Sequence, residues 1–253
     1  MDKPPVPWYN GRETEGKDGA GMTVTYIGHS GFLVETGSCY YLFDYFQGPL
    51  PLLNRDKPVI VLSSHSHHDH YNPAVFSMLA RQGVGQIFPV LSSDIPPRDR
   101  PEHLRCRVVS PGETCILPQG QTLKAYRSTD LGVAFCIRDG EEWIYHAGDL
   151  NDWVWQGEPE ADNRRMTLDY RQEIDRLAQD LAGQTLTAAF VVLDPRQEED
   201  YARGLRYFLD RVAAERVYPM HFWEQPQVVC RFLEEYPQYA GRIVPPDSWN
   251  IVR

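Results

Sequence analysis

The segment PVIVLSSHSHHDH, residues 58–70, runs from an apolar stretch directly into a cluster of histidines and an aspartate. A short continuous apolar run of this kind predicts a strand that is buried on both faces. His65 and His67 are two residues apart, so they point the same way from an extended segment. Asp69 and His70 follow on the turn to the next element and can face a second point. Imidazoles with a carboxylate suit Zn²⁺, Mn²⁺ or iron, so the segment predicts one or two divalent metal ions.

The alternative is that the segment forms a solvated, histidine-rich turn without a metal. Four imidazoles so close together would repel one another as they became protonated, which disfavours this alternative.

Strands and helices are expected on both sides of this segment. Three strands joined by glycine-containing turns precede it, and a helix at 72–83 follows it, with Asn72 at its N-cap and Gly83 at its stop. The order of strands first, then strands mixed with helices, favours two sheets packed face to face with helices outside. The expected strands are 22–29, 31–36, 39–45, 58–65, 86–90, 105–109, 113–117, 121–127, 132–138, 142–146, 188–195 and 215–222. Further helices are expected at 167–182, 200–214 and 226–235, and an irregular stretch at 150–166.

The composition is that of an ordinary globular protein. The 253 residues are 42% hydrophobic and 24% charged, which predicts one domain at 22–253 after a polar N-terminal arm at 1–21. The formal net charge of −10 disfavours nucleic acid as a partner and leaves a small-molecule substrate as the expectation. No apolar run approaches the length of a membrane span or a signal peptide. Five cysteines without a CxxC pair are expected to be reduced, as in a cytoplasmic protein.

Several motifs together resemble the metallo-β-lactamase superfamily, and more narrowly its lactonase-like and phosphodiesterase-like bacterial hydrolases. The likeness runs from about residue 22 to 225 and includes GHSGFLVE (28–35) at its start. It implies an α/β protein with a four-layer αβ/βα sandwich and a dinuclear metal site at one edge of the two sheets. The resemblance also implies the metal ligands, which are His65, His67, Asp69, His70, Asp149 in IYHAGD and His221 in YPMHFW. Asp44, which ends CYYLFD, matches the family aspartate that supports the metal loop, and Asp149 matches the carboxylate that bridges the two ions.

The chain departs from the family pattern at one ligand. The family places a further histidine where this chain has AYRSTDLGVAF (125–135), which contains none. Asp130, His146 or water are the candidates to replace it, and a weaker or mononuclear site is the alternative. His146 is expected either as a ligand or as a buried residue that supports one. For His29, a place near the metal or in the pocket is favoured over a plain turn.

Four further side chains are candidates for the substrate pocket. Trp153 and Trp155 directly follow the bridging aspartate, where they would either wall a pocket or pack an irregular loop onto the core. Arg196 and Trp223 follow strand ends, where sites collect. Arg196 would hold a phosphate or carboxylate, or lie on the surface.

These residues favour a metal-dependent hydrolase. Its metal-bound hydroxide would attack a lactone, another ester or a phosphodiester, with Asp69 and Asp149 as catalytic residues. Zinc is the expected ion, with manganese and iron as alternatives. The competing functions are a redox enzyme like the mononuclear-iron sulfur dioxygenases and a degenerate, non-catalytic scaffold that binds a metal or small ligand.

Overall fold

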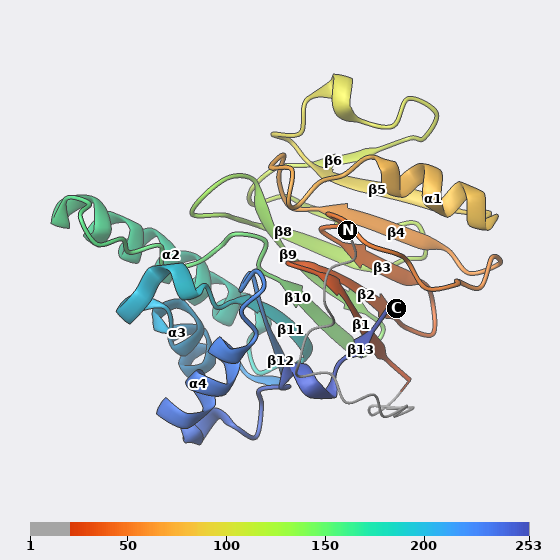
Figure 1. The fold of residues 1–253 in the computed structure, drawn as a ribbon. Coiled ribbons are helices and arrows are strands. Elements are labelled where there is room, and N and C mark those ends of the chain that lie inside the picture. Colours follow the sequence, from red (N-terminus) through yellow and green to blue (C-terminus); the bar gives the residue numbers. More distant parts are fainter. Residues whose placement is uncertain (1–20, 253) are drawn as a thin grey trace, which may run out of the picture.

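Two β-sheets form the centre of the protein, as the computed structural model of residues 21–252 shows (Figure 1). The first sheet has the strand order β13-β1-β2-β3-β4-β5-β6, and the second has the order β12-β11-β10-β9-β8-β7. The strands of the first sheet are β1 (Thr23–Gly28), β2 (Gly31–Glu35), β3 (Tyr40–Phe43), β4 (Val59–Ser63), β5 (Ile87–Ser92), β6 (Arg107–Val109) and β13 (Asn250–Ile251). Those of the second are β7 (Thr114–Ile116), β8 (Thr122–Arg127), β9 (Val133–Asp139), β10 (Glu142–His146), β11 (Leu186–Val192) and β12 (Ala214–Met220).

Helices cover the outer face of each sheet. Helix α1 (Ala74–Gln82) lies beside the first sheet, and α2 (Glu160–Leu181), α3 (Arg203–Arg211) and α4 (Gln227–Glu235) lie on the side of the second (Figure 1). The predicted α/β sandwich is therefore confirmed. The predicted arm at 1–21 lies outside the described residues except for Gly21.

Strand β4 shows how the sequence encodes these layers. All five of its residues are buried, as the apolar run predicts. Val59 and Val61 belong to the core between the first sheet and α1, whereas Ile60 and Leu62 belong to the core between the sheets. This alternation places both faces of the strand against apolar side chains. The polar residues 64–70 follow the strand, at the edge of the sheet.

Helix α1 begins at Ala74, with Pro73 as its N-cap, one residue later than predicted, and it ends at the predicted Gly83. The side chain of Asn72 accepts a hydrogen bond from the backbone N–H of Ala74 at 3.0 Å. Gly83 ends the helix in the left-handed conformation, with φ of 82°. The helix starts shortly after the histidine segment 65–70, so its first turn fixes the C-terminal end of that segment.

Two helices and one strand differ from the sequence prediction in ways that have a physical reason. Helix α2 begins at Glu160 rather than at 167. The sequence prediction missed its first turns because they are largely polar and exposed and have no apolar periodicity. The predicted helix 200–214 is shorter, since a 3-10 turn occupies 195–200 and β12 begins at Ala214. The C-terminal strand β13 was not predicted, because its two residues gain their conformation from parallel pairing with β1.

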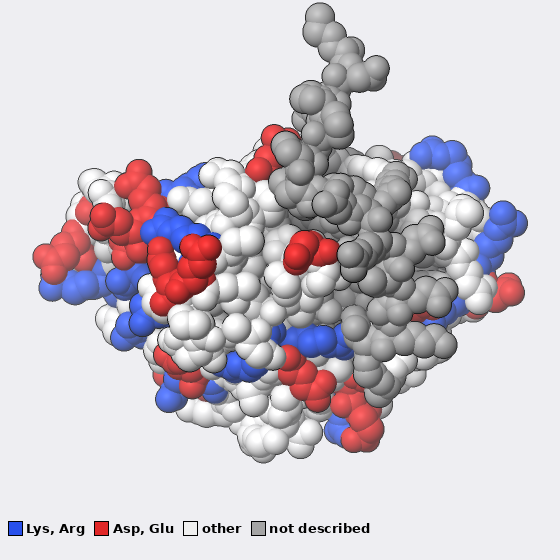
Figure 2. All heavy atoms as spheres, turned by 60° about the horizontal axis from the view of Figure 1, so that its bottom comes forward, with Lys and Arg blue, Asp and Glu red and all other residues white. Residues whose placement is uncertain are grey.

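The cysteines, the length and hydropathy of the helices and the surface charges complete the description of the fold. The five cysteines are free. No helix among residues 21–252 is long and apolar enough to cross a membrane. On the face shown in Figure 2, both acidic and basic residues are scattered over the visible described surface, with broad uncharged areas between them.

Candidate metal centre

The histidines and aspartates of interest lie directly after the carboxyl ends of strands. Asp44 follows β3, the segment 64–70 follows β4, and Asp149 follows β10 after two residues. Asp194 follows β11 after one residue, and His221 follows β12 directly. Parallel neighbours end at the same edge of a sheet, so these side chains meet at one edge of the sandwich.

Two groups of donor atoms form at this edge. Within each group, the candidate ligand atoms lie within 4.8 Å of one another. One group is fully buried, and the other includes two exposed members. The buried group is His29, Asp69, His70 and His221, and the more open group is His65, His67, Asp130 and Asp149.

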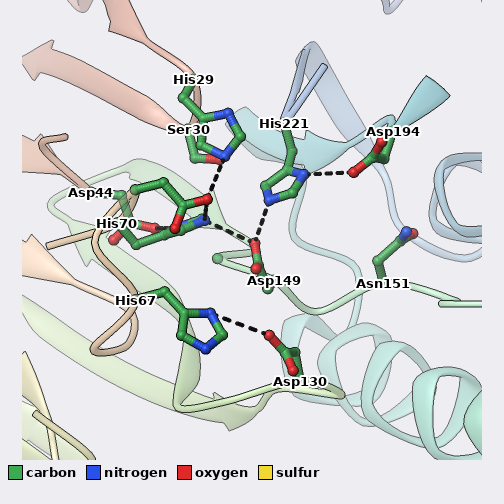
Figure 3. Close-up of polar contacts among 12 residues, drawn as sticks. His29, Ser30, Asp44, His67, His70, Asp130, Asp149, Asn151, Asp194 and His221 are labelled. Carbon is green, nitrogen blue, oxygen red and sulfur yellow. Dashed lines mark hydrogen bonds and ion pairs between the residues drawn. The ribbon is translucent and has the colours of Figure 1, made fainter. Parts of the chain in front are cut away.

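Asp149 lies between the two groups (Figure 3). Its Oδ1 atom is 3.2 Å from Nε2 of His70 and 3.3 Å from Nε2 of His221. Its Oδ2 atom is 3.5 Å from Nε2 of His65. One carboxylate oxygen therefore faces each group, which is the arrangement that a carboxylate bridging two ions requires.

Buried partners orient the histidine rings toward this centre. Asp44 Oδ2 is 2.7 Å from Nδ1 of His70, and Asp194 Oδ2 is 2.9 Å from Nδ1 of His221. Ser64 Oγ is 2.9 Å from Nδ1 of His65. Each contact occupies one ring nitrogen and leaves Nε2 to face the other donors, as outer partners do in metal sites.

The donor set fits divalent cations. Among the described residues, four buried atoms here have no hydrogen-bond partner: both ring nitrogens of His29, Nε2 of His70 and Oδ1 of Asp149. Buried polar atoms without a partner are costly, so their convergence indicates that they serve a ligand. Three imidazoles with a carboxylate suit zinc, and the mixed group of two imidazoles and two carboxylates suits zinc, manganese or iron.

The charges of the site favour a cation at its centre. Burial disfavours a charged His221, but Asp149 and Asp194 outweigh burial and raise its pKa to about 10. Burial also disfavours an ionised Asp149, yet His70 and His221 hold its pKa well below the usual range. Burial lowers the pKa of both His65 and His29 to about 4, so these rings are neutral and can offer a lone pair.

The backbone of the site is strained at several of these residues. His29, Asp44 and His221 have φ values of 53°, 40° and 65°. Non-glycine residues seldom adopt positive φ, and such conformations cluster at functional sites because the surrounding structure must enforce them.

The structure brings together all six predicted ligands and adds two neighbours. Asp130 reaches the more open group, where its Oδ2 atom is 3.5 Å from Nδ1 of His67. His29 joins the buried group, with Nε2 at 3.3 Å from Oδ2 of Asp69. Each group thus contains four residues, whereas the sequence alone left the group of His65 with three unless Asp130 or His146 completed it.

His146 supports the site rather than joining either group. Its Nε2 atom is 2.9 Å from the carbonyl oxygen of Ser30, and its Nδ1 atom accepts a hydrogen bond from Gly148 N–H at 3.1 Å. The ring is fully buried and stacks on Phe43. With both nitrogens engaged, His146 fixes the turn that presents Asp149.

The pocket candidates divide into packed and exposed residues. Trp153 is buried and donates from Nε1 to the carbonyl oxygen of Asp149 at 2.8 Å, so it packs the loop onto the core. Trp155 is half-buried and Trp223 is 36% exposed. Arg196 is bound to Asp194 and leaves 47% of its side chain exposed.

The sequence analysis missed two residues that fix the loop 64–70, which carries four of the proposed ligands. Asp94 accepts a hydrogen bond from Ser66 N–H at 2.8 Å, and Ser64 donates to Asp44 at 2.6 Å. Asp94 follows the end of β5, which is parallel to β4. Its place after a parallel neighbour is the signal that could have identified it.

The fold and the centre define a metal-binding α/β sandwich. The profile of the family described as "Beta-lactamase superfamily domain" matches residues 23–155, more than half of the chain. The chain belongs to this family.

Known proteins similar to the chain include metal-dependent enzymes. A UPF0173 metal-dependent hydrolase of Methylacidiphilum infernorum is 30% identical over 149 residues, which are 51% of this chain and 62% of the relative. The metallo hydrolase Igni18 of Ignicoccus hospitalis has a similar structure, with a TM-score of 0.61, 17% identity and coverage of 88% and 94%. The diiron β-hydroxylase CmlA of Streptomyces venezuelae has a TM-score of 0.54 and 15% identity, covering 89% of this chain and 53% of its own. At these identities the two structures show the fold alone.

Replacement of Asp194 by Asn is expected to weaken metal binding. The substitution removes the charged acceptor that orients His221, and losses of such outer partners lower metal affinity about 10- to 100-fold. Competition with a chelator measures the effect. Asp210→Asn is the matched control, because Asp210 accepts a hydrogen bond from Tyr239 away from the centre. Equal affinities in the two variants would contradict the assigned role of Asp194.

Proposed function

We propose that the protein is a metal-dependent hydrolase that acts on an ester, a lactone or a phosphodiester of a small molecule. The observation that carries the proposal is the position of Asp149 between two groups of donors, with one oxygen facing each. The metal-dependent hydrolase similar to this chain supports the same activity. The proposed ligands are His29, Asp69, His70 and His221 in the buried group and His65, His67 and Asp130 in the more open group, with Asp149 shared between the two.

Divalent ions held by these residues would lower the pKa of water and polarise the bond to be hydrolysed. The residues of the chain have separate tasks. Asp44, Ser64 and Asp194 fix the ring orientations. Asp149 and Asp69 are ionised and can accept a proton from water or orient it by hydrogen bonding. Because the buried group excludes bulk water, the electrostatic interactions between its charged residues are stronger than they would be in water.

Zinc is the proposed ion for the buried group, because three imidazoles and one carboxylate are typical of zinc sites. The more open group has two imidazoles and two carboxylates, which also suits iron. An iron-dependent oxidation is therefore the second candidate function.

One experiment separates these functions. The purified protein is analysed for zinc, manganese and iron, and then assayed with bis(p-nitrophenyl) phosphate, p-nitrophenyl acetate and a simple lactone. Metal-dependent turnover of at least one substrate without oxygen consumption is the expected result. Oxygen-dependent activity would favour the iron enzyme, and bound metal without turnover of any kind would favour a non-catalytic scaffold.

Asp130→Asn is expected to weaken the more open ion selectively. The side chains of His67 and Asp130 are 45% and 44% exposed, whereas all four residues of the buried group are buried. Because these two ligands are exposed, water can compete with them for the ion of the more open group. A chelator should therefore remove this ion first. We expect about one ion per chain in the variant at a chelator concentration that leaves two in the wild type. Simultaneous loss of both ions in wild type and variant would contradict the unequal sites.

We also propose that the protein acts in the cytoplasm as a single hydrolase domain from residue 22 onward. The five free cysteines support a reducing compartment. The shared core between the two sheets, which contains residues from Met22 to Trp249, supports the single domain.

A further inference from the structure

Three residues from separate loops stack beside the metal centre. Trp155 follows β10, Arg196 lies in the 3-10 turn after β11, and Trp223 follows β12. The guanidinium carbon of Arg196 lies 5.9 Å from the ring centroid of Trp155 and 5.3 Å from that of Trp223. Such distances are typical of cation–π contacts, so the two rings hold the guanidinium from two loops.

Among the described residues, only part of the guanidinium of Arg196 makes hydrogen bonds. Arg196 donates from Nε to Asp194 at 2.9 Å and from Nη2 to the same carboxylate at 2.5 Å. Its Nη1 atom makes no hydrogen bond within the described part of the chain, and the side chain is 47% exposed. Asp194 is fully buried and also binds His221, so the exposed end of Arg196 is anchored to the metal centre.

Trp223 connects this cation to the centre from the other side. Its ring centroid is 4.4 Å from that of His29 and 6.0 Å from that of His221. The residue has φ of 54° and is 36% exposed. A bulky side chain at positive φ is a strained arrangement, and such arrangements cluster at functional sites. An aromatic ring that is partly exposed beside a metal centre can pack against the apolar part of a ligand.

We propose that Trp155, Arg196 and Trp223 form a binding site for a negatively charged group of the substrate, a phosphate or a carboxylate. Arg196 binds the anion through Nη1, and Trp223 packs against the apolar part of the substrate next to it. The assignment rests on the proposed hydrolase function and narrows its substrates to anionic esters or phosphodiesters. Arginine is suited to this task because its planar donors match both oxyanions, and its charge is fixed at neutral pH.

The competing explanation is that Arg196 only holds Asp194 in place. A purely positioning arginine would affect metal binding, whereas a substrate-binding arginine would affect the affinity for anions at constant metal content. The two explanations therefore differ in a measurable quantity.

The test is calorimetric titration of the metal-loaded protein with phenylphosphonate and, separately, with benzoate. Arg196→Gln is expected to raise the Kd of the preferred anion about 10- to 100-fold, the usual range for a hydrogen bond to a charged group. The anion with the larger loss identifies the phosphate or the carboxylate as the group recognised. Arg231→Gln is the matched control, because Arg231 binds Glu235 at 2.7 Å and stacks on Tyr201 away from the centre. It should change neither Kd by more than about twofold.

A second variant tests the aromatic side of the site. Trp223→Ala should weaken binding of phenylphosphonate more than that of methylphosphonate, because only the former carries an apolar ring. Equal losses would remove Trp223 from the proposed site.

The outcomes for the site and for the hydrolase function are distinguishable. Unchanged Kd values in Arg196→Gln, absence of anion binding to the wild type, or loss of binding together with loss of metal would overturn the anion site. Anion binding that depends on Arg196, in a protein that hydrolyses none of the substrates named above, would leave the site standing and overturn the hydrolase.

Discussion

Asp149→Asn is expected to lower kcat/KM for the substrate turned over by about 1,000-fold or more, while the protein stays folded. Both oxygens of Asp149 face buried imidazoles, one oxygen toward each group of donors. Asparagine keeps the shape of the side chain but removes its charge and replaces one acceptor oxygen with a donor. The two groups then lose the carboxylate that they share.

The measurement combines steady-state kinetics with metal analysis and a chemical unfolding curve. Asp56→Asn, at an exposed loop position, is the control and should keep wild-type kinetics. Wild-type turnover in Asp149→Asn with full metal content would show that this carboxylate is not part of the reacting centre.

Gly132→Ala is expected to destabilise the protein by about 3–5 kcal/mol, from positive φ and overpacking together. Gly132 has φ of 68°, and a Cβ atom there would lie 2.0 Å from the carbonyl oxygen of Ser64 and 2.7 Å from Cβ of His65. That carbonyl accepts a hydrogen bond from Val133 N–H at 2.9 Å, so the loop before β9 is tied to the metal loop. A backbone atom cannot rotate away, and the clash must displace one of the two segments.

Gly140→Ala separates the two causes. Gly140 has φ of 61°, but a Cβ atom there would meet no heavy atom within 4 Å. Its substitution should cost only the conformational part, about 1–2 kcal/mol. Urea unfolding with excess chelator measures both free energies without a contribution from bound metal. Equal losses in the two variants would show that the contact with Ser64 is unimportant.

The sequence alone was sufficient for the features that depend on local pattern. The apolar run at 58–65 predicts a strand buried on both faces, and the structure confirms a fully buried strand at Val59–Ser63. The spacing of the histidines and the aspartate after that strand predicts metal ligands, whereas Asp149 and His221 were inferred from the resemblance to the metallo-β-lactamase superfamily. The donor atoms of all these residues converge. Parallel strands end at the same edge of a sheet, so residues that follow such strands can meet there.

Only the tertiary structure decided which residues complete the two groups. Asp130 meets His67, and His29 meets Asp69, across distances of 63 and 40 residues in the chain. The sequence left His146 open as a ligand or as a buried residue that supports one, and packing turns its ring toward Ser30 and Gly148. Arg196 likewise lies between two tryptophans because three loops from separate strands meet there. Loop side chains have no periodicity that fixes their direction, so their neighbours are set by how the two sheets pack against each other.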